Sequence, residues 1–347
     1  MGEYVLEMNN ITKVFPGVKA LDGVTLKVRP GSVHALMGEN GAGKSTLMKC
    51  LFGIYHEDGG EIILDGKKQV INTSKQALDL GISMIHQELH PIRYRPVMEN
   101  IWLGRFPMKG IAVDKKTMIK KTKELFKEVD LDIDPEVLAG TLSASNLQLV
   151  EIAKAVSYNS KIIIMDEPTS SLTDNETEHL FKIIRQLQAK GCAIIYISHR
   201  MDEIFSICDR VSVYRDGQYI GSGDTKDLSE AQLIKMMVGR EITDVFPKLD
   251  AEIGEVIFEA KNIVRADNKV KNVSFSVRRG EILGIGGLVG AGRSELVEGI
   301  FGMHELSGGE IFVKGKQVKV HSPHDIIREG VALITEDRKG TGLNLTG

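Results

Sequence analysis

The sequence predicts an α/β fold that occurs twice in one chain, the second time only in part. Nearly continuous apolar runs, such as 32–37 and 161–165, alternate with helical stretches such as 44–54 and 176–190. This alternation is typical of a parallel sheet whose strands are buried on both faces. A glycine-rich segment joins the first apolar run to the helical stretch that follows it. The third observation is a repeat with a constant offset.

The repeat sets the domain organisation. Residues 38–45 match residues 287–294, an offset of 249 that is the difference between 38 and 287, and further pairs downstream keep this offset without a gap. A constant offset indicates a duplicated domain, because chance similarity would drift. We therefore expect a complete first domain over 1–242, a linker over 243–254, and the first part of a second domain over 255–347.

Composition argues against several classes of protein. The 347 residues carry a formal net charge of −3, which gives no electrostatic reason to expect a nucleic-acid partner. Three widely spaced cysteines without a CxxC pair argue against a disulfide framework or a zinc site and favour a reducing compartment. The first residues lack the apolar core of a signal peptide, and no apolar run approaches the roughly 18 residues that span a bilayer. If the protein works at a membrane, we expect another protein to hold it there.

The segment 38–45 satisfies the pattern G-x-x-x-x-G-K-[ST] in full. It follows the apolar strand 33–37 and opens a helix, which is the setting in which this pattern binds the phosphates of a nucleotide. Its glycines allow backbone N–H groups to surround the phosphates at the positive end of the helix. We expect Lys44 to reach the β- and γ-phosphates and Ser45 to offer its hydroxyl to Mg²⁺. A glycine-rich turn without function is the alternative.

Two acidic residues, Asp166 and Glu167, directly follow the buried strand 161–165. In an open parallel sheet the carboxyl ends of the strands face the ligand crevice. We expect Asp166 to hold the water shell of Mg²⁺ and Glu167 to polarise the attacking water. Two acids at a strand end are usually only a solvated helix start. The phosphate-binding pattern upstream favours the functional interpretation.

Three further side chains are candidates for the same site. His199 closes the strand 193–198, and Gln87 follows the strand 83–86 in the same way. A lone histidine is more often a surface or packed side chain, but its place at a strand end favours contact with the γ-phosphate, and Gln87 is expected to complete the Mg²⁺ shell. Phe15 precedes a Pro-Gly turn and is either a packing residue or a ring that stacks on adenine.

Taken in chain order, these features resemble the nucleotide-binding domain of ABC transporters. The order is the phosphate-binding loop, Gln87, a signature region, Asp166-Glu167, the run 170–173 and His199. A tandem arrangement with a degenerate second loop is similar to the ATPases of monosaccharide importers within that family.

The resemblance implies ATP and Mg²⁺ as cofactors. It implies catalysis by Glu167 and His199, and Mg²⁺ ligation by Ser45, Gln87 and Asp166. The ATP-binding residues that it implies are Phe15, Gly38, Glu39, Asn40, Gly41, Ala42, Gly43, Lys44, Ser45, Thr46 and Gln87.

The resemblance also locates a degenerate signature in the first domain, just before a helix that we expect to start near Gln148. This signature consists of Leu142, Ser143, Ala144, Ser145 and Asn146. The full family motif has two glycines where this chain has Ala144 and Ser145. Their Cβ atoms hinder close backbone approach to a phosphate presented by a partner domain.

A second run, LSGGE at 306–310, looks more like the family signature but is not expected to act as one. The repeat aligns residues 307–310 with 58–61. We expect a turn there, because two adjacent glycines supply backbone with positive φ. The second domain also departs from the family in its phosphate-binding loop, where Arg293 stands in place of lysine, and Glu336 stands at the position of Gln87.

The implied function is that of an ATP-binding subunit of a sugar importer, peripheral to the cytoplasmic face of the cell membrane. Its implied partners are permease subunits, a sugar-binding protein that acts through the permease, and a second ABC domain or subunit, with no nucleic acid. Galactose or methyl galactoside is the implied sugar. The alternatives are an importer of another monosaccharide, such as ribose or xylose, and a shortened ATP-binding product with little turnover. A tandem ABC protein of ribosomes or DNA is less consistent, since such proteins usually keep both signatures and a long charged linker.

Overall fold

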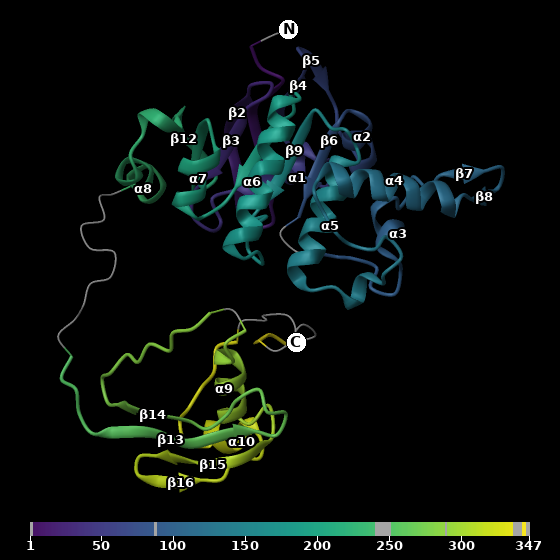
Figure 1. The fold of residues 1–347 in the computed structure, drawn as a ribbon. Coiled ribbons are helices and arrows are strands. Elements are labelled where there is room, and N and C mark those ends of the chain that lie inside the picture. Colours follow the sequence, from purple (N-terminus) through teal and green to yellow (C-terminus); the bar gives the residue numbers. More distant parts are fainter. Residues whose placement is uncertain (1–2, 87–88, 240–250, 289, 336–341, 345–347) are drawn as a thin grey trace. The chain divides into compact units, whose positions relative to one another are not determined.

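The computed structural model describes residues 3–86, 89–239, 251–288, 290–335 and 342–344 (Figure 1). The chain divides into two compact units, residues 1–243 and 244–347, and each is described by itself. Most of the expected linker over 243–254, as well as Gln87 and Glu336, lies outside the described residues.

Unit 1 is built around a six-stranded sheet with the order β12-β11-β3-β10-β9-β6. Its strands are β3 (Val33–Met37), β6 (Ile82–Ile85), β9 (Ile162–Asp166), β10 (Ala193–Ile197), β11 (Arg210–Arg215) and β12 (Gln218–Asp224). All neighbouring pairs are parallel except β11 and β12. Every residue of β3, β6, β9 and β10 is buried, as the apolar runs predict.

A second, antiparallel sheet of unit 1 has the order β2-β1-β4-β5. Its strands are β1 (Leu6–Phe15), β2 (Val18–Val28), β4 (Gly59–Leu64) and β5 (Lys67–Gln69). Apolar side chains of this sheet and of helix α1 (Lys44–Leu51) pack on one face of the central sheet, against Leu36, Ile164 and Ile195.

The other face of the central sheet, which carries Ala35, Ile163 and Ile194, packs against helices. These helices are α5 (Ala144–Val156), α6 (Asp174–Ala189), α7 (Met201–Ile207) and α8 (Glu230–Val238) (Figure 1). The remaining elements of unit 1 are α2 (Ser74–Asp79), α3 (Val97–Ile101), α4 (Lys115–Glu128), the hairpin of β7 (Met108–Lys109) and β8 (Ala112–Val113), and the 3₁₀ turns η1 (Ala139–Thr141) and η2 (Thr225–Asp227). The central sheet is therefore covered on both faces. A ligand can reach it at the ends of its strands.

Unit 2 contains an antiparallel sheet with the order β14-β13-β15-β16, which matches the order β2-β1-β4-β5 of unit 1. Its elements are β13 (Val256–Arg265), β14 (Val273–Arg278), α9 (Arg293–Ile300), β15 (Leu306–Val313), β16 (Lys316–Val318) and α10 (Pro323–Arg328). Its small core includes Ile263, Leu296 and Ile326. Among the residues that the structure describes, no helix combines the length and the apolar character needed to cross a membrane.

The expected turn at 307–310 is wrong, because these residues lie inside strand β15. Gly309 has a φ of 106°, and a Cβ atom there would lie 2.8 Å from the carbonyl oxygens of Lys261 and Asn262 on β13. The pairing of β13 with β15 shifts register directly beyond Lys261. Glycine is therefore required at position 309, because the register shift between β13 and β15 leaves no room for a side chain there. Its counterpart Gly60 has the same conformation, with a φ of 101°.

Candidate nucleotide-binding site

The candidate residues follow strands that end at one edge of the central sheet. Strand β10 lies between β3 and β9, so that Ile197 pairs with Leu36 on one side and with Asp166 on the other. The segments after these three strands therefore come together, although they are far apart in the sequence. Strand β6 continues the sheet beside β9, with Ile85 opposite Met165. Gln87 follows β6 but lies outside the described residues.

At two glycines of the loop from Gly38 to Gly43, neighbouring backbone lies too close to leave room for a side chain. A Cβ atom on Gly38 would lie 2.2 Å from the carbonyl oxygen of Tyr214, and one on Gly43 would lie 2.7 Å from that of Ala20. Gly41 and Gly43 have φ values of 87° and 95°, in the left-handed region that glycine adopts without strain. Close packing with alternating backbone conformation is the geometry that suits a phosphate-binding loop, in which successive N–H groups point toward one anion.

Helix α1 begins at Lys44, directly after this loop. Its N-cap is Gly43, which makes no side-chain cap, and its first turn contains no acidic residue. The positive end of the helix is thus not neutralised by its own side chains. The Lys44 ammonium donates to the carbonyl oxygens of Gly38 at 2.7 Å and Glu39 at 3.0 Å, which holds it inside the loop. Burial lowers the Lys44 pKa, and the nearby Asp166 and Glu167 carboxylates oppose that shift.

Asp166, the last residue of β9, is buried, and its carboxylate lies close enough to the Ser45 hydroxyl on α1 to interact with it. Burial raises the Asp166 pKa, while the hydrogen bond from Ser45 and the charge of Lys44 lower it. A carboxylate and a hydroxyl on adjacent elements suit a hard cation such as Mg²⁺, which binds few protein oxygens beside water and phosphate. In the described part of the chain, no group of three or more His, Cys, Asp or Glu side chains forms a metal cluster.

Glu167 and His199 meet across the ends of β9 and β10. His199 Nδ1 lies 3.3 Å from Glu167 Oε1. The Glu167 backbone N–H donates to the Ile197 carbonyl at 2.9 Å, and its φ of 49° is uncommon for a residue other than glycine. Such conformations concentrate at functional sites because the surrounding structure must hold them. The His199 side chain is 73% exposed and that of Glu167 is 21% exposed, so the pair opens to solvent.

Phe15 ends strand β1 and is half-buried. Its ring packs edge-on against Tyr55, with 5.2 Å between the ring centroids, and the Lys13 ammonium lies 5.6 Å from its centroid. The ring therefore has a packing role in unit 1. Its stacking on adenine stays a prediction.

The five signature residues lie at the start of helix α5, and the expectation that this helix starts near Gln148 is wrong. The helix begins at Ala144 because Ser143 caps it, accepting a hydrogen bond from the Asn146 N–H at 3.2 Å. The Ser143 and Ser145 hydroxyls lie 3.1 Å apart, and Ser145 is also hydrogen-bonded to Glu176 on α6. Sequence reasoning missed the serine cap because the glycines of the full motif were the features sought.

Sequence reasoning also missed a buried polar network beside His199. It includes Thr169, Tyr196 and Glu203, all less than 6% exposed. The available signal was a tyrosine and a serine, Tyr196 and Ser198, within an otherwise aliphatic run, followed by an acid one helical turn beyond His199. By its apolar character alone, the run 193–198 predicts only a buried strand.

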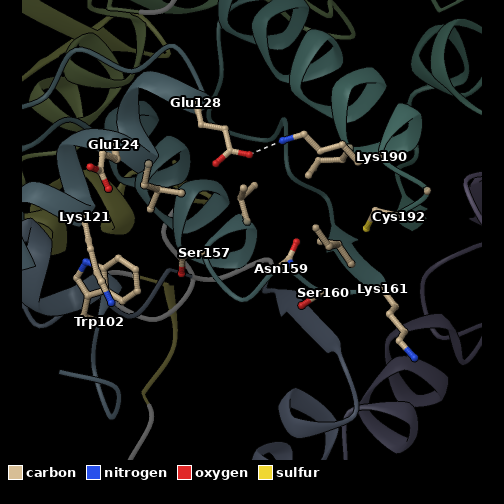
Figure 2. Close-up of a pocket in the computed structure, with 15 residues that line it drawn as sticks. Trp102, Lys121, Glu124, Glu128, Ser157, Asn159, Ser160, Lys161, Lys190 and Cys192 are labelled. Atoms are coloured by element: carbon tan, nitrogen blue, oxygen red, sulfur yellow. Dashed lines mark hydrogen bonds and ion pairs between the residues drawn. The ribbon is translucent and has the colours of Figure 1, made fainter. Parts of the chain in front are cut away.

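A cavity of about 490 Å³ lies away from this edge (Figure 2). Its lining includes Ser160 and Lys161, which precede β9, and Cys192, which precedes β10. Figure 2 also shows an ion pair between Lys190 and Glu128 in this lining. The cavity is at the amino ends of the strands, so none of the nucleotide-site residues borders it.

Comparison with known proteins gives one consistent result. The ABC transporter family matches residues 21–170 and 270–344. Three similar proteins are each named galactose/methyl galactoside import ATP-binding protein MglA. That of Clostridium tetani is 58% identical over 98% of this chain and 68% of its own length. That of Clostridium perfringens (ATCC 13124) is 57% identical over 98% and 66%, and that of Escherichia coli K12 is 55% identical over 99% and 68%. The chain thus spans about two thirds of these relatives.

Two solved structures agree with the fold of unit 1. A nucleotide-free ATP-binding cassette from an ABC transporter has a TM-score of 0.60 and 28% identity, covering 68% of this chain and 96% of that one. An ATP-binding cassette of an ABC transporter in its ADP conformation also has a TM-score of 0.60, with 29% identity, covering 69% and 100%.

Proposed function

The chain belongs to the ABC transporter family, and we propose that it is the ATP-binding subunit of an importer that drives uptake of galactose or methyl galactoside through a separate permease. The observation that carries the proposal is the convergence of the 38–45 loop, Asp166, Glu167 and His199 at the carboxyl edge of β3, β9 and β10. This convergence supports the proposal that a nucleoside triphosphate is bound and hydrolysed at this edge of the sheet.

The residues of the chain have separate roles in binding and hydrolysing ATP. ATP with Mg²⁺, when bound, supplies the phosphoryl group that is transferred to water. The loop amides and Lys44 bind the phosphates, and Ser45 and Asp166, with Gln87, hold the metal. Glu167 accepts a proton from the attacking water. His199, which lies 3.3 Å from the Glu167 carboxylate, would contact the γ-phosphate. Degenerate residues at 142–146 make the first signature a weak partner for a second nucleotide site.

The sugar and the partners follow from the relatives. Three similar proteins carry galactose/methyl galactoside import in their names, which supports this sugar over ribose or xylose. Import needs a path through the membrane, so the partners are permease subunits and a sugar-binding protein that delivers the sugar to them. The subunit then works as a peripheral protein at the cytoplasmic face of the membrane.

We further propose that unit 2 is the first part of a second ABC domain. Its sheet order matches that of unit 1, and Gly292 caps α9 with a φ of 86°, as Gly43 caps α1. By the repeat, residues 282–286 correspond to β3 and residues 331–334 to β6. In unit 1 these positions are buried beside β10 and β9, whereas in unit 2 Ile282 is 99% exposed and Ile334 is 97% exposed.

One alternative is that these 347 residues bind ATP but turn it over slowly. In the described residues of unit 2, strands equivalent to β9 and β10 are absent, and with them the acidic pair and the histidine of a second site. ATP would then be held by unit 1 alone.

The test is sugar uptake in cells that lack their own ATP-binding subunit but retain the permease and the binding protein. The chain, or the chain extended to the length of its relatives, is supplied with labelled galactose, ribose or xylose. Galactose uptake that disappears with Lys44→Ala supports the proposal. Uptake of ribose or xylose in place of galactose refutes the sugar. Uptake by neither chain, when the purified chain binds ATP, supports the shortened-product alternative, and absence of ATP binding refutes the proposal as a whole.

A further inference from the structure

A buried carboxylate lies directly beneath the exposed His199–Glu167 pair. Glu203 is in the first turn of α7, and its side chain is 1% exposed. Its Oε2 atom accepts hydrogen bonds from the Tyr196 hydroxyl and the Ser198 hydroxyl, both at 2.8 Å. Its Oε1 atom lies 3.1 Å from an Arg200 guanidinium nitrogen. A buried charge is tolerated only when it is paired and hydrogen-bonded in this way.

Two of the three partners of Glu203 are the residues on either side of His199. Ser198 precedes it and Arg200 follows it, and the Ser198 hydroxyl also accepts the Arg200 backbone N–H at 3.1 Å. The chain at His199 is therefore held at both flanks by one carboxylate. The histidine needs this support, because 73% of its own side chain is exposed and little packing constrains it.

The same network reaches the segment that carries Glu167. Thr169, two residues beyond Glu167, is buried and lies close enough to the Tyr196 hydroxyl for the two side chains to interact. A second link is the hydrogen bond from the Glu167 N–H to the Ile197 carbonyl at 2.9 Å. Glu203 is thus connected, through these neighbouring residues, to the segments that carry both members of the exposed pair.

We infer that Glu203 is a positioning residue. It holds Ser198 by a hydrogen bond and Arg200 by an ion pair, and so maintains the contact between His199 and Glu167. This inference rests on the proposed ATPase function of the site. Reactive groups lose much of their effect when they are displaced by about 1 Å, with rate losses near 10²-fold. A buried anchor beneath an exposed pair maintains such a geometry.

The test is a double-mutant cycle on the full chain. Single-turnover hydrolysis of Mg-ATP and binding of a fluorescent ATP analogue are measured for Glu203→Gln, His199→Ala and the double variant. Glu203→Gln keeps an acceptor for Tyr196 and Ser198 but loses the ion pair with Arg200, so we expect the rate to fall about tenfold. Analogue affinity should change less than about twofold. In the His199→Ala background the same change should lower the rate by less than about twofold, because Glu203 acts through His199.

Ser212→Ala is the matched control. It removes another buried hydrogen bond of the same sheet, that between the Ser212 hydroxyl and His34 Nε2 at 2.8 Å, on strand β11, which pairs with neither β10 nor β9. Its hydrolysis rate should match that of the unmodified chain. If Glu203→Gln does not fold, Tyr196→Phe and Ser198→Ala each remove one hydrogen bond of the network and are measured in its place.

A readout independent of activity separates this inference from the proposed function. The NMR signals of the His199 imidazole, assigned by their loss in His199→Ala, should shift in Glu203→Gln and stay unchanged in Ser212→Ala. The positioning role is overturned if the rate losses of the two single variants add fully in the double variant. It is also overturned if the His199 signals are unchanged in Glu203→Gln. A chain that neither binds nor hydrolyses ATP overturns the proposed function, and the NMR comparison still decides on Glu203.

Discussion

The imidazole of His199 and the carboxylate of Glu167 lie 3.3 Å apart at the ends of two adjacent parallel strands, β10 and β9. They are 32 residues apart in the sequence, and parallel pairing of the strands brings them together. If Glu167 activates water, Glu167→Gln should lower hydrolysis by roughly 10²–10⁴-fold and leave ATP binding intact, because the amide cannot accept the proton. Single-turnover hydrolysis and nucleotide titration measure the two effects. Equal losses of binding and turnover would instead indicate a structural acid.

Nucleotide binding should depend on unit 1 far more than on unit 2. Lys44→Ala removes the ammonium that the 38–45 loop encloses and should abolish most ATP binding. Arg293→Ala, at the matching position of unit 2, should change it little, because the planar guanidinium is a poor substitute for the lysine. A titration that shows two sites of equal affinity in the unmodified chain would contradict this prediction.

Asp166→Asn should stabilise the nucleotide-free chain at neutral pH while weakening metal-dependent binding. Burial raises the folded-state pKa of Asp166 above its ordinary value of 3.8, so the folded state binds the proton more tightly than the unfolded state does. Stability from this group is therefore full below the unfolded pKa and is lost as the pH rises through the raised folded pKa. The Asp166→Asn variant has no carboxyl group to ionise, so it does not lose this stability as the pH rises.

Thermal unfolding of the Asp166→Asn variant and the unmodified chain at pH 7 and near pH 4 checks this sign. The gain should be present at pH 7 and shrink at the lower pH. The same preparations should show ATP binding in Mg²⁺ that is weaker by about tenfold or more, consistent with a lost charge–metal contact. A variant less stable than the unmodified chain at pH 7 would count against the burial argument.

Gly309→Ala should destabilise the sheet of unit 2. The added Cβ atom would lie 2.8 Å from two backbone oxygens of β13, in backbone with a φ of 106°. Gly315→Ala is the control, since Gly315 also has positive φ, 75°, but has no atom within 4 Å of its Cβ position. It should cost only the conformational penalty of about 1–2 kcal/mol. Hydrogen exchange of β13 amides should accelerate more in Gly309→Ala, and equal effects would contradict the close-contact explanation.

The run at 306–310 should have no part in hydrolysis. Ser307 lies in strand β15, and its hydroxyl is 3.5 Å from the Val264 carbonyl of the neighbouring strand β13. Ser307→Arg should therefore leave steady-state hydrolysis unchanged, and Ser143→Arg should lower it at most slightly. Turnover of the 347-residue chain should be slow and should rise several-fold when the chain is extended to the length of its relatives. Loss of activity in the Ser307 variant, with ATP binding intact, would show that this run is the signature.

The sequence by itself determined the fold class, the family and the phosphate-binding loop. These follow from local patterns: an apolar run of strand length is buried wherever it lies in a parallel sheet, and the G-x-x-x-x-G-K-[ST] pattern imposes its own backbone shape. The family assignment is confirmed by the match over 21–170 and 270–344. The acids after β9 and the histidine after β10 could be assigned to one edge, because parallel strands share their carboxyl ends.

Only the tertiary structure decided contacts between residues distant in the sequence. Gly309 was expected in a turn because paired glycines favour turns, yet the carbonyls of β13 require it inside a strand. Helix α5 begins at Ala144 because the Ser143 hydroxyl caps it, a choice that depends on side-chain geometry. The sequence showed Glu203 only as an acid one helical turn beyond His199 and did not show its partners. Its role near His199 depends on the position of α7, which brings one buried carboxylate into hydrogen bonds with Tyr196 and Ser198 and into an ion pair with Arg200, and burial makes these contacts costly to lose.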